Sequence, residues 1–300
     1  MAEHSKGYLF AITAFLFWGG ISPIYFKEVG SVDSFEVLLY RIIFSFFTLL
    51  PFLLFKKEFK SFMVTIKDFT KIKYLFFSTM FASINWLIFI WAVANERIIE
   101  ASLGYYINPL VNVLLGFLFL KERLTRNQNI AIFIAVLAVV YQLITLGTIP
   151  FISLALAFTF GFYGLVRKKV NLGSIVGLFI EILILMPFAL IYIWYAYDFS
   201  NLAITQDDHY IAWMLTLTGL VTVIPLLLFN GAATRMKLAT LGFFQYIGPT
   251  MAFSVAIFIY DEPFNSNKMV TFVLIWIALL IFSLDSIVKS YRHKKGLSKA

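Results

Sequence analysis

Two charged residues lie inside long apolar segments of the sequence. Arg41 belongs to the apolar segment 36–55, and Glu181 belongs to the segment 174–195. A charged side chain at membrane depth is costly, so it usually marks an ion, proton or substrate pathway. We expect Glu181 to take up and release protons or to bind a cationic group of a substrate, with a structural ion pair as the alternative. Arg41 could extend to the nearer membrane surface, or pair with Glu181 if helix tilt closes the difference in their depths.

A polar stripe is predicted along the segment 100–120. Tyr105, Asn108 and Asn112 stand three and four positions apart, so they share one face of a helix. An amide facing lipid would leave its donors and acceptors unpaired, so this face is expected to contact protein or a water-filled cavity. Two interpretations are open: hydrogen bonding between packed helices, or one wall of a substrate pocket.

Other aromatic and amide side chains are candidates for the same pocket because they also lie well inside apolar segments. Aromatic rings and a few polar groups suit flat or cationic organic molecules. For each aromatic residue taken singly, packing in the core is the alternative. The candidate pocket residues are Trp18, Asn85, Trp86, Tyr105, Asn108, Asn112, Tyr163, Gln245 and Tyr246.

Prolines and glycines inside the segments indicate places where a helix can bend. Each internal proline removes one backbone hydrogen bond and frees the carbonyl four residues earlier. Such a carbonyl can bind substrate or allow a hinge, and a plain kink is the alternative. The hinge candidates are Gly19, Gly20, Pro23, Pro109 and Pro249.

The elements that must position these residues are apolar helices. Only 13% of the 300 residues are charged, whereas soluble domains average about 25%. Runs of about twenty apolar residues, the length that crosses a hydrocarbon core, recur along the chain. We therefore expect an all-α polytopic membrane protein. Ten transmembrane helices are predicted, at 7–26, 36–55, 74–94, 100–120, 128–146, 149–166, 174–195, 210–230, 238–260 and 269–288.

The positive charges indicate how these helices are oriented. If the N-terminus is cytoplasmic, only Lys27, Arg97 and Lys268 of the 24 Lys and Arg residues lie in outer connections. Such a bias predicts cytoplasmic termini in a bacterial-type inner membrane. It also explains the net charge of +8 without nucleic acid as a partner. The basic run 167–169 is interpreted as a topology anchor.

Neither a metal nor a cofactor site is predicted. The chain has no cysteine, and its three histidines lie outside the predicted helices. It also has no G-x-x-x-x-G-K-[ST] loop that would bind the phosphates of ATP. The chain is therefore not expected to be an enzyme.

The sequence contains an internal repeat. A shift of 140 residues aligns Pro109 with Pro249 and Glu122 with Glu262, and "ASLG" at 101–104 matches "ATLG" at 239–242. The repeats are predicted at 1–146 and 147–300, with five helices each. Because five is odd, the second copy must be inverted in the membrane. Inverted repeats are typical of secondary transporters, whose substrate site lies near the midplane between the halves. Duplication for structure alone is the alternative.

Several strings resemble a known family. "WAVANERIIEASLGYYINPLVN", "FYGLVRKK", "TVIPL" and "LGFFQYIGPT", with the closing "FLKERL", are similar to the EamA repeat of the drug/metabolite transporter superfamily, in its chloramphenicol-sensitivity (RarD) branch. The resemblance covers essentially the whole chain. It implies a ten-helix carrier of the inner membrane and supplies no particular substrate.

The sequence as a whole predicts a secondary transporter that exports small metabolites or drug-like molecules by alternating access. Its expected partners are the lipid bilayer, a small-molecule substrate and protons. A flippase for a lipid-linked molecule is the alternative within transport. A membrane-embedded enzyme or a receptor is the alternative outside it.

Overall fold

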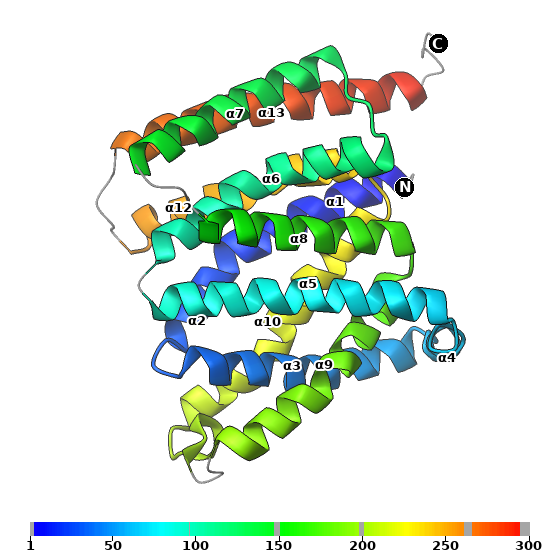
Figure 1. Ribbon diagram of the computed structural model, residues 1–300, viewed down its shortest axis with the longest axis vertical. Coiled ribbons are helices and arrows are strands. Elements are labelled where there is room, and N and C mark those ends of the chain that lie inside the picture. Colours follow the sequence, from blue (N-terminus) through cyan, green and yellow to red (C-terminus); the bar gives the residue numbers. More distant parts are fainter. Residues whose placement is uncertain (1–2, 96, 147–150, 198–200, 261–265, 295–300) are drawn as a thin grey trace.

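The computed structural model describes residues 3–95, 97–146, 151–197, 201–260 and 266–294, and this part of the chain forms a helical bundle without strands (Figure 1). Eight of its helices are long and apolar enough to cross a membrane, judged by length and composition. The prediction of an all-α multi-pass membrane protein is confirmed at this level.

The helices of the two halves follow one another in chain order. The first half contains α1 (Glu3–Leu16), the π-helical turn η1 (Phe17–Ile21), α2 (Ser22–Glu28), α3 (Ser34–Phe55), α4 (Phe59–Thr65), α5 (Phe69–Ala94), α6 (Ile98–Leu120) and α7 (Arg126–Leu146). The second contains α8 (Phe151–Val170), α9 (Ser174–Ala196), the 3-10 turn η3 (Ala203–Thr205), α10 (His209–Ala233), α11 (Leu238–Phe244), α12 (Ile247–Phe258) and α13 (Ser266–Lys294).

The last two expected segments differ from the other eight. The segment expected at 238–260 is divided into α11 and α12 by a turn at 245–246. Pro249 has no N–H group, so the carbonyl of Gln245 lacks its usual helical donor and accepts from the amide of Gly248 at 3.0 Å instead. The apolar part of α13, Met269–Asp285, is shorter than the other candidate spans. In the first half, α6 continues through Pro109 as one helix.

The first segment contains a break in its α-helical pattern at the two predicted hinge glycines. Gly19 and Gly20 lie in η1, and Pro23 lies in the first turn of α2, where a proline is tolerated. A Cβ atom at Gly19 would lie 2.2 Å from the carbonyl oxygen of Gly248 in α12. The glycine therefore allows the backbones of η1 and α12 to approach closely.

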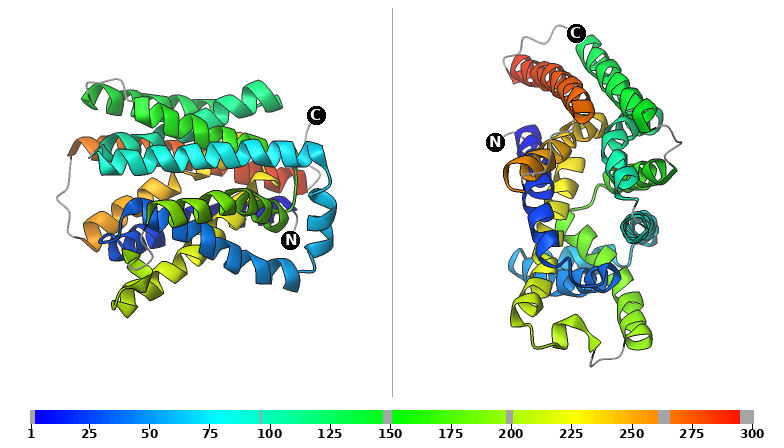
Figure 2. Two further views of the ribbon diagram at one scale, coloured as in Figure 1. Left: turned by 60° about the horizontal axis from the view of Figure 1, so that its bottom comes forward. Right: turned by 90° about the vertical axis from the view of Figure 1, so that its left-hand side faces the viewer.

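Most of the packing joins helices from different halves of the chain. The α6 helix packs against α8 and α11, α3 packs against α9 and α10, and α10 also packs against α1. The α5 helix packs against α8, while α7 and α13 lie together at one edge of the bundle (Figures 1 and 2). The two predicted repeats consequently share one core instead of forming separate bundles.

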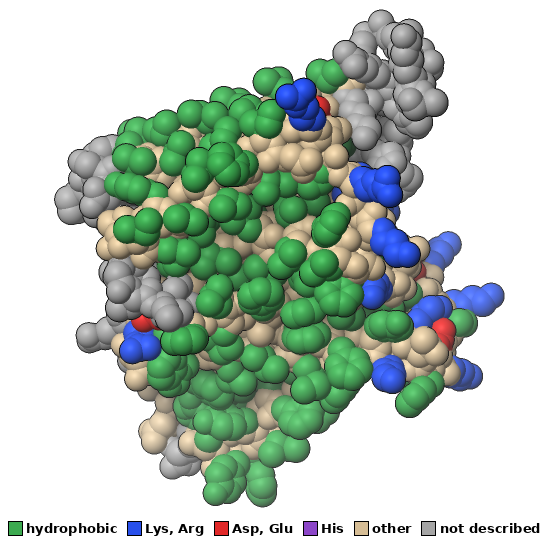
Figure 3. Space-filling view, turned by 45° about the horizontal axis from the view of Figure 1, so that its top comes forward, with side chains coloured by type: hydrophobic (Ala, Val, Ile, Leu, Met, Phe, Trp, Pro, Cys, Tyr) green, Lys and Arg blue, Asp and Glu red, His purple; other side chains and the backbone are tan. Residues whose placement is uncertain are grey.

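The surface separates apolar and charged side chains. On the face shown in Figure 3, hydrophobic side chains cover the middle, and most Lys and Arg side chains gather at one end. The start of α1, the end of α13 and the short helix α4 lie at the same end of the bundle (Figure 1). Many large apolar side chains on this surface are exposed, including Phe55, Trp194 and Phe258. An apolar belt of this kind suits a lipid environment.

The turn after α6 is fixed to the start of α11 by one carboxylate. The oxygens of Glu122 accept hydrogen bonds from the amides of Leu238 at 2.8 Å and Ala239 at 3.0 Å. A negative charge at this position satisfies amides that have no partner within the helix and complements the helix dipole. Lys168 of α8 lies 3.9 Å from the same carboxylate. Three helix ends therefore meet at Glu122.

Gly19→Ala and Gly20→Ala test the close approach of η1 and α12. At Gly20 the nearest atom to a new Cβ is the flexible end of Met251, at 3.6 Å. We expect Gly19→Ala to lower the free energy of unfolding by about 1–3 kcal/mol through overpacking, and Gly20→Ala to be close to neutral. Reversible unfolding of the purified protein in detergent measures both. Equal stability of the two variants would contradict the packing described here.

Candidate functional site

A buried ionic cluster joins α8 and α9. Nη1 of Arg167 lies 3.6 Å from Oε1 of Glu181, and the two side chains are 0% and 5% exposed. Both residues belong to helices that are candidate membrane spans. A charge pair this deep is maintained only when each charge offsets the cost of burying the other.

A glycine on α9 makes room for the arginine. A Cβ atom at Gly177 would lie 2.0 Å from Nη1 of Arg167, so the guanidinium group packs directly on the backbone of α9. Gly177 stands one turn before Glu181, on the same face of the helix. Among the described residues, no acceptor forms a hydrogen bond with Nε, Nη1 or Nη2 of Arg167. Its charge is therefore balanced only by the carboxylate of Glu181, without close hydrogen bonds.

The carboxylate of Glu181 has further partners on other helices. Ser78 of α5 donates a hydrogen bond to Oε1, and the hydroxyl of Tyr163 of α8 donates to Oε2 at 3.4 Å. Nδ2 of Asn230 in α10 donates in turn to the Tyr163 hydroxyl at 3.0 Å. One carboxylate thus connects four helices, and a change in its charge would affect all of them.

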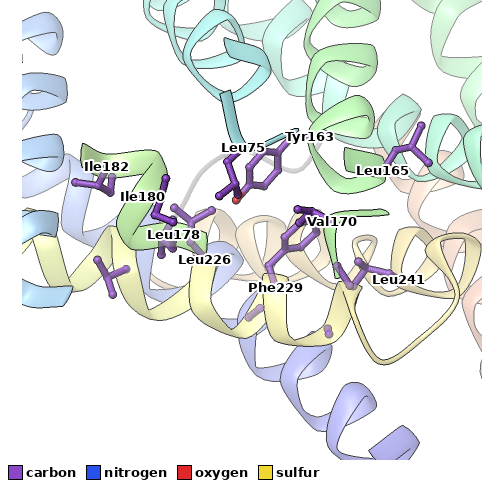
Figure 4. Close-up of a cluster of buried hydrophobic side chains, with 14 of the residues drawn as sticks. Leu75, Tyr163, Leu165, Val170, Leu178, Ile180, Ile182, Leu226, Phe229 and Leu241 are labelled. Carbon is purple, nitrogen blue, oxygen red and sulfur yellow. The ribbon is translucent and has the colours of Figure 1, made fainter. Parts of the chain in front are cut away.

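A small cavity lies directly against this cluster. Trp86, Tyr163 and Glu181 line it together with apolar side chains of α5, α8, α9 and α10. It has room for about one water molecule. Figure 4 shows Tyr163 among the buried apolar residues of this region, including Leu178, Leu226 and Phe229. In this structure the cavity is therefore too small for an organic molecule.

Arg41 and Glu181 do not form a pair. Nε of Arg41 donates to the hydroxyl of Thr222 in α10 at 3.0 Å, and its guanidinium carbon lies 5.1 Å from the centre of the Trp86 ring. The partner of Glu181 is Arg167 instead. The Arg167 side chain in the basic run 167–169 is fully buried. The interpretation of that run as a topology anchor stays a prediction.

The polar stripe on α6 connects helices in this conformation. Nδ2 of Asn108 donates to the carbonyl of Ala157 at 2.7 Å, and Nδ2 of Asn112 donates to Oε1 of Gln245 at 2.6 Å. Both asparagines are buried. Oδ1 of Asn112 has no hydrogen-bond partner among the described residues. Their contacts fit the helix-packing interpretation, while the unpaired oxygen leaves one polar group free for another partner.

The remaining predicted residues are divided between packing positions and the cavity. Asn85 donates to the carbonyl of Leu156, and Tyr246 donates to the carbonyl of Tyr106. Both bonds join neighbouring helices.

Trp18 contacts the rings of Phe15, Phe160 and Phe229. Tyr105 is 55% exposed and interacts electrostatically with Arg41. The structure therefore places Trp86, Tyr163 and Glu181 at one cavity, and the guanidinium group of Arg41 lies beside the Trp86 ring. The other candidates lie outside that lining.

No group of three or more His, Asp or Glu residues that could hold a metal ion occurs in the described part of the chain. The side chains around the cavity are instead one ion pair, hydroxyls, an amide and aromatic rings. These groups can bind a small polar or amphipathic molecule and can exchange a proton.

Residues 5–144 match the model of the EamA-like transporter family. The chain is 46% identical to Protein RarD of Salmonella typhi over 94% of this chain and 96% of that protein. It is 44% identical to Protein RarD of Escherichia coli K12 over 97% and 98% of the two chains. It is also 44% identical to an uncharacterized transporter of Vibrio cholerae, with 98% and 97% covered.

The chain belongs to the EamA-like transporter family, in its RarD branch. A solved crystal structure with 16% sequence identity matches its fold with a TM-score of 0.72, over 93% of this chain and 97% of the other. At that identity the likeness concerns the fold alone.

The sequence of this EamA family member did contain a signal for Arg167. Tyr163 and Arg167 stand four positions apart, as do Gly177 and Glu181. Each pair therefore shares a helix face. Because Arg167 is followed by two lysines, the sequence indicates a charged helix end and gives no partner for Arg167. The position of Gly177 opposite it becomes evident only when α8 and α9 are packed.

A double-mutant cycle tests the buried ion pair. Arg167→Met and Glu181→Leu are each expected to lower the free energy of unfolding by about 3–5 kcal/mol, because each leaves an uncompensated buried charge. The double variant is expected to be more stable than either single variant. The more solvent-accessible pair Arg97–Glu100, with N and O atoms 3.7 Å apart, is the control and should show a coupling below about 1 kcal/mol. Additive losses at 167 and 181 would contradict the pairing.

Proposed function

We propose that this protein is a secondary transporter that moves small organic molecules by alternating access. The observation that carries the proposal is the buried cluster of Arg167, Glu181 and Tyr163 beside a small cavity. In membrane proteins such charges mark pathways for ions, protons or substrates. The relatives named as transporters support transport over membrane-embedded catalysis. Export is the direction that we propose.

The packing of the helices supports two inverted five-helix repeats, which we propose at 1–146 and 147–300. We exchange each helix for its counterpart in the other half. The contact of α6 with α8 then corresponds to the contact of α11 and α12 with α1, and the contact of α5 with α8 corresponds to that of α10 with α1. The contact of α3 with α10 corresponds to that of α9 with α5, and the structure contains all of these contacts. Three further contacts each join a helix to its own counterpart, so the exchange leaves them unchanged. They are α3 with α9, α6 with α11, and α7 with α13. Such an exchange is what a transporter with a pseudo-two-fold axis in the membrane plane requires.

In this arrangement, α11 and α12 together form the ninth membrane segment and α13 forms the tenth. Both termini then lie in the cytoplasm, at the end of the bundle where most Lys and Arg side chains gather. A bacterial inner membrane is the location that this charge bias favours. The break at 245–246 faces Asn112 through Gln245, so the interrupted helix lies beside the polar stripe of α6.

Protons are the coupling ion that we propose, with Glu181 as the group that carries them. Protonation would remove the negative charge that balances Arg167 and would change the hydrogen bonds from Ser78 and Tyr163. Because these partners lie on α5 and α8, the cost of the unbalanced arginine would favour a different packing of the helices. The partner Arg167 also makes binding of a cationic substrate group by Glu181 less favourable than proton exchange.

Transport in proteoliposomes tests this function. Fluxes of amino acids, amines, organic acids and drug-like molecules are measured with and without a pH gradient. We expect at least one compound to be transported at a rate that depends on the gradient, and Glu181→Gln to abolish that dependence. Asp68→Asn, which removes a carboxylate just before α5 that is paired with Lys71 in the first turn of that helix, should leave it unchanged.

Three results would contradict parts of this account. Unchanged flux and pH dependence in Glu181→Gln would exclude proton coupling at Glu181. Transport of no compound, together with strong binding of a lipid-linked molecule, would favour a flippase. Reproducible hydrolytic or transferase turnover would exclude the transporter assignment.

A further inference from the structure

Arg41 is a cation inside the helical bundle that has no acidic partner among the described residues. Its nearest hydrogen-bond acceptor is the hydroxyl of Thr222, which binds Nε at 3.0 Å. Among the described residues, no carboxylate lies within 4.0 Å of its guanidinium nitrogens, and the groups that interact with it electrostatically are Tyr25 and Tyr105. In contrast, Glu181 at the equivalent position of the second repeat is paired with Arg167. Of these two charges at equivalent positions, only the positive charge of Arg41 therefore has no oppositely charged partner among the described residues.

The side chain is oriented by aromatic rings and directed into the protein. The ring centres of Phe26 and Trp86 lie 5.2 Å and 5.1 Å from the guanidinium carbon. Arginine interacts favourably with such rings. With Thr222 on Nε, these contacts hold Arg41 among α2, α5 and α10. An arginine that extended to the lipid surface would not be held in this way.

The edge of the guanidinium that carries Nη1 and Nη2 is available to a ligand. Neither nitrogen forms a hydrogen bond with a described residue, and neither is among the buried polar atoms without a partner. Arg41 as a whole is partly buried. Two parallel N–H donors in one plane match the two oxygens of a carboxylate and bind it more selectively than a lysine would.

Trp86 connects this arginine to the cavity already described. Its ring lies beside Arg41, and it also lines the cavity that contains Tyr163 and Glu181. A molecule whose anionic group reached Arg41 would therefore bring the rest of its structure against Trp86. Tyr105, exposed and within electrostatic range of Arg41, lies in the same region.

We propose that Arg41 binds the carboxylate of the transported substrate, and that Trp86 contacts the aromatic or aliphatic part of the same molecule. The substrate class is then a small organic anion with an apolar body. This inference rests on the proposed transport function and goes beyond it, because it assigns the chemistry of the substrate. The asymmetry between the repeats gives the two halves different roles, since the first binds the anion and the second exchanges the proton.

Binding measurements on the full-length protein test the anion site. The probes are phenylacetate and indole-3-acetate, with phenylacetamide and phenethylamine as neutral and cationic analogues, titrated calorimetrically into the detergent-solubilised protein at neutral pH. We expect at least one carboxylate to bind at least tenfold more tightly than its amide or amine analogue. Arg41→Gln should abolish this preference, and Arg41→Lys should retain part of it.

Arg97→Gln is the matched control, because it removes an exposed arginine from a connection outside the helices. It should bind the carboxylates as the unmodified protein does. Arg41→Lys keeps the positive charge but removes the two parallel N–H donors of the guanidinium group. Thermal unfolding of each variant is also measured, so that a loss of binding can be separated from a loss of folding. Absence of carboxylate binding, or equal binding by the unmodified protein and a folded Arg41→Gln variant, overturns the proposal.

Counterflow of the bound carboxylate in proteoliposomes separates this inference from the proposed function. Binding that depends on Arg41 without any transport would support the anion site and contradict the carrier. Transport of an amine or a neutral compound that does not depend on Arg41 would support the carrier and overturn the anion site.

Discussion

The ion pair between Arg167 and Glu181 is the interaction on which the central packing depends. Two opposite charges buried in the protein stabilise each other only while they stay close, because neither has water to replace its partner. Gly177 is required at that position because the guanidinium group occupies the space of a side chain. Ser78 and Tyr163 are positioned by the same carboxylate. The ion pair and hydrogen bonds of this cluster therefore connect α5, α8, α9 and α10 through one titratable group.

The second constraint is the way in which the two halves of the chain share a core. Helices that follow each other in sequence pack less than helices of opposite halves. Movement of one half against the other would consequently change the cavity, the polar stripe of α6 and the contact at Glu122 together. Glu122 holds the start of α11 at the cytoplasmic side in the proposed topology.

The sequence predicted the class of fold and most of its segments, because apolar runs of membrane-spanning length are a strong signal. Eight segments were recovered close to their expected bounds. The break within the ninth could not be read from Pro249 alone, since α6 carries Pro109 at the equivalent position and continues as a helix. The surroundings of the two prolines differ, because Gln245, beside the break, accepts a hydrogen bond from Asn112 of α6.

The candidate residues were predicted less completely. Glu181, Tyr163 and Trp86 were selected as isolated polar or aromatic groups in apolar segments, and the structure brings them to one cavity. Arg167 was missed because position in a basic run is a weaker guide than the partner on the next helix. Asn108 was selected correctly as a side chain that faces protein, but sequence spacing alone could not distinguish a pocket wall from a helix contact.

The protonation state of Glu181 is the most direct test of the central claim. Infrared difference spectra are recorded between neutral and acidic pH on the full-length protein in lipid. We expect a carbonyl band of a protonated carboxyl group that Glu181→Gln removes from the difference spectrum, accompanied by changes in the tyrosine bands that Tyr163→Phe removes. If the carbonyl band is missing, or is the same in Glu181→Gln, the buried ion pair is a fixed structural element and proton exchange at this site is contradicted.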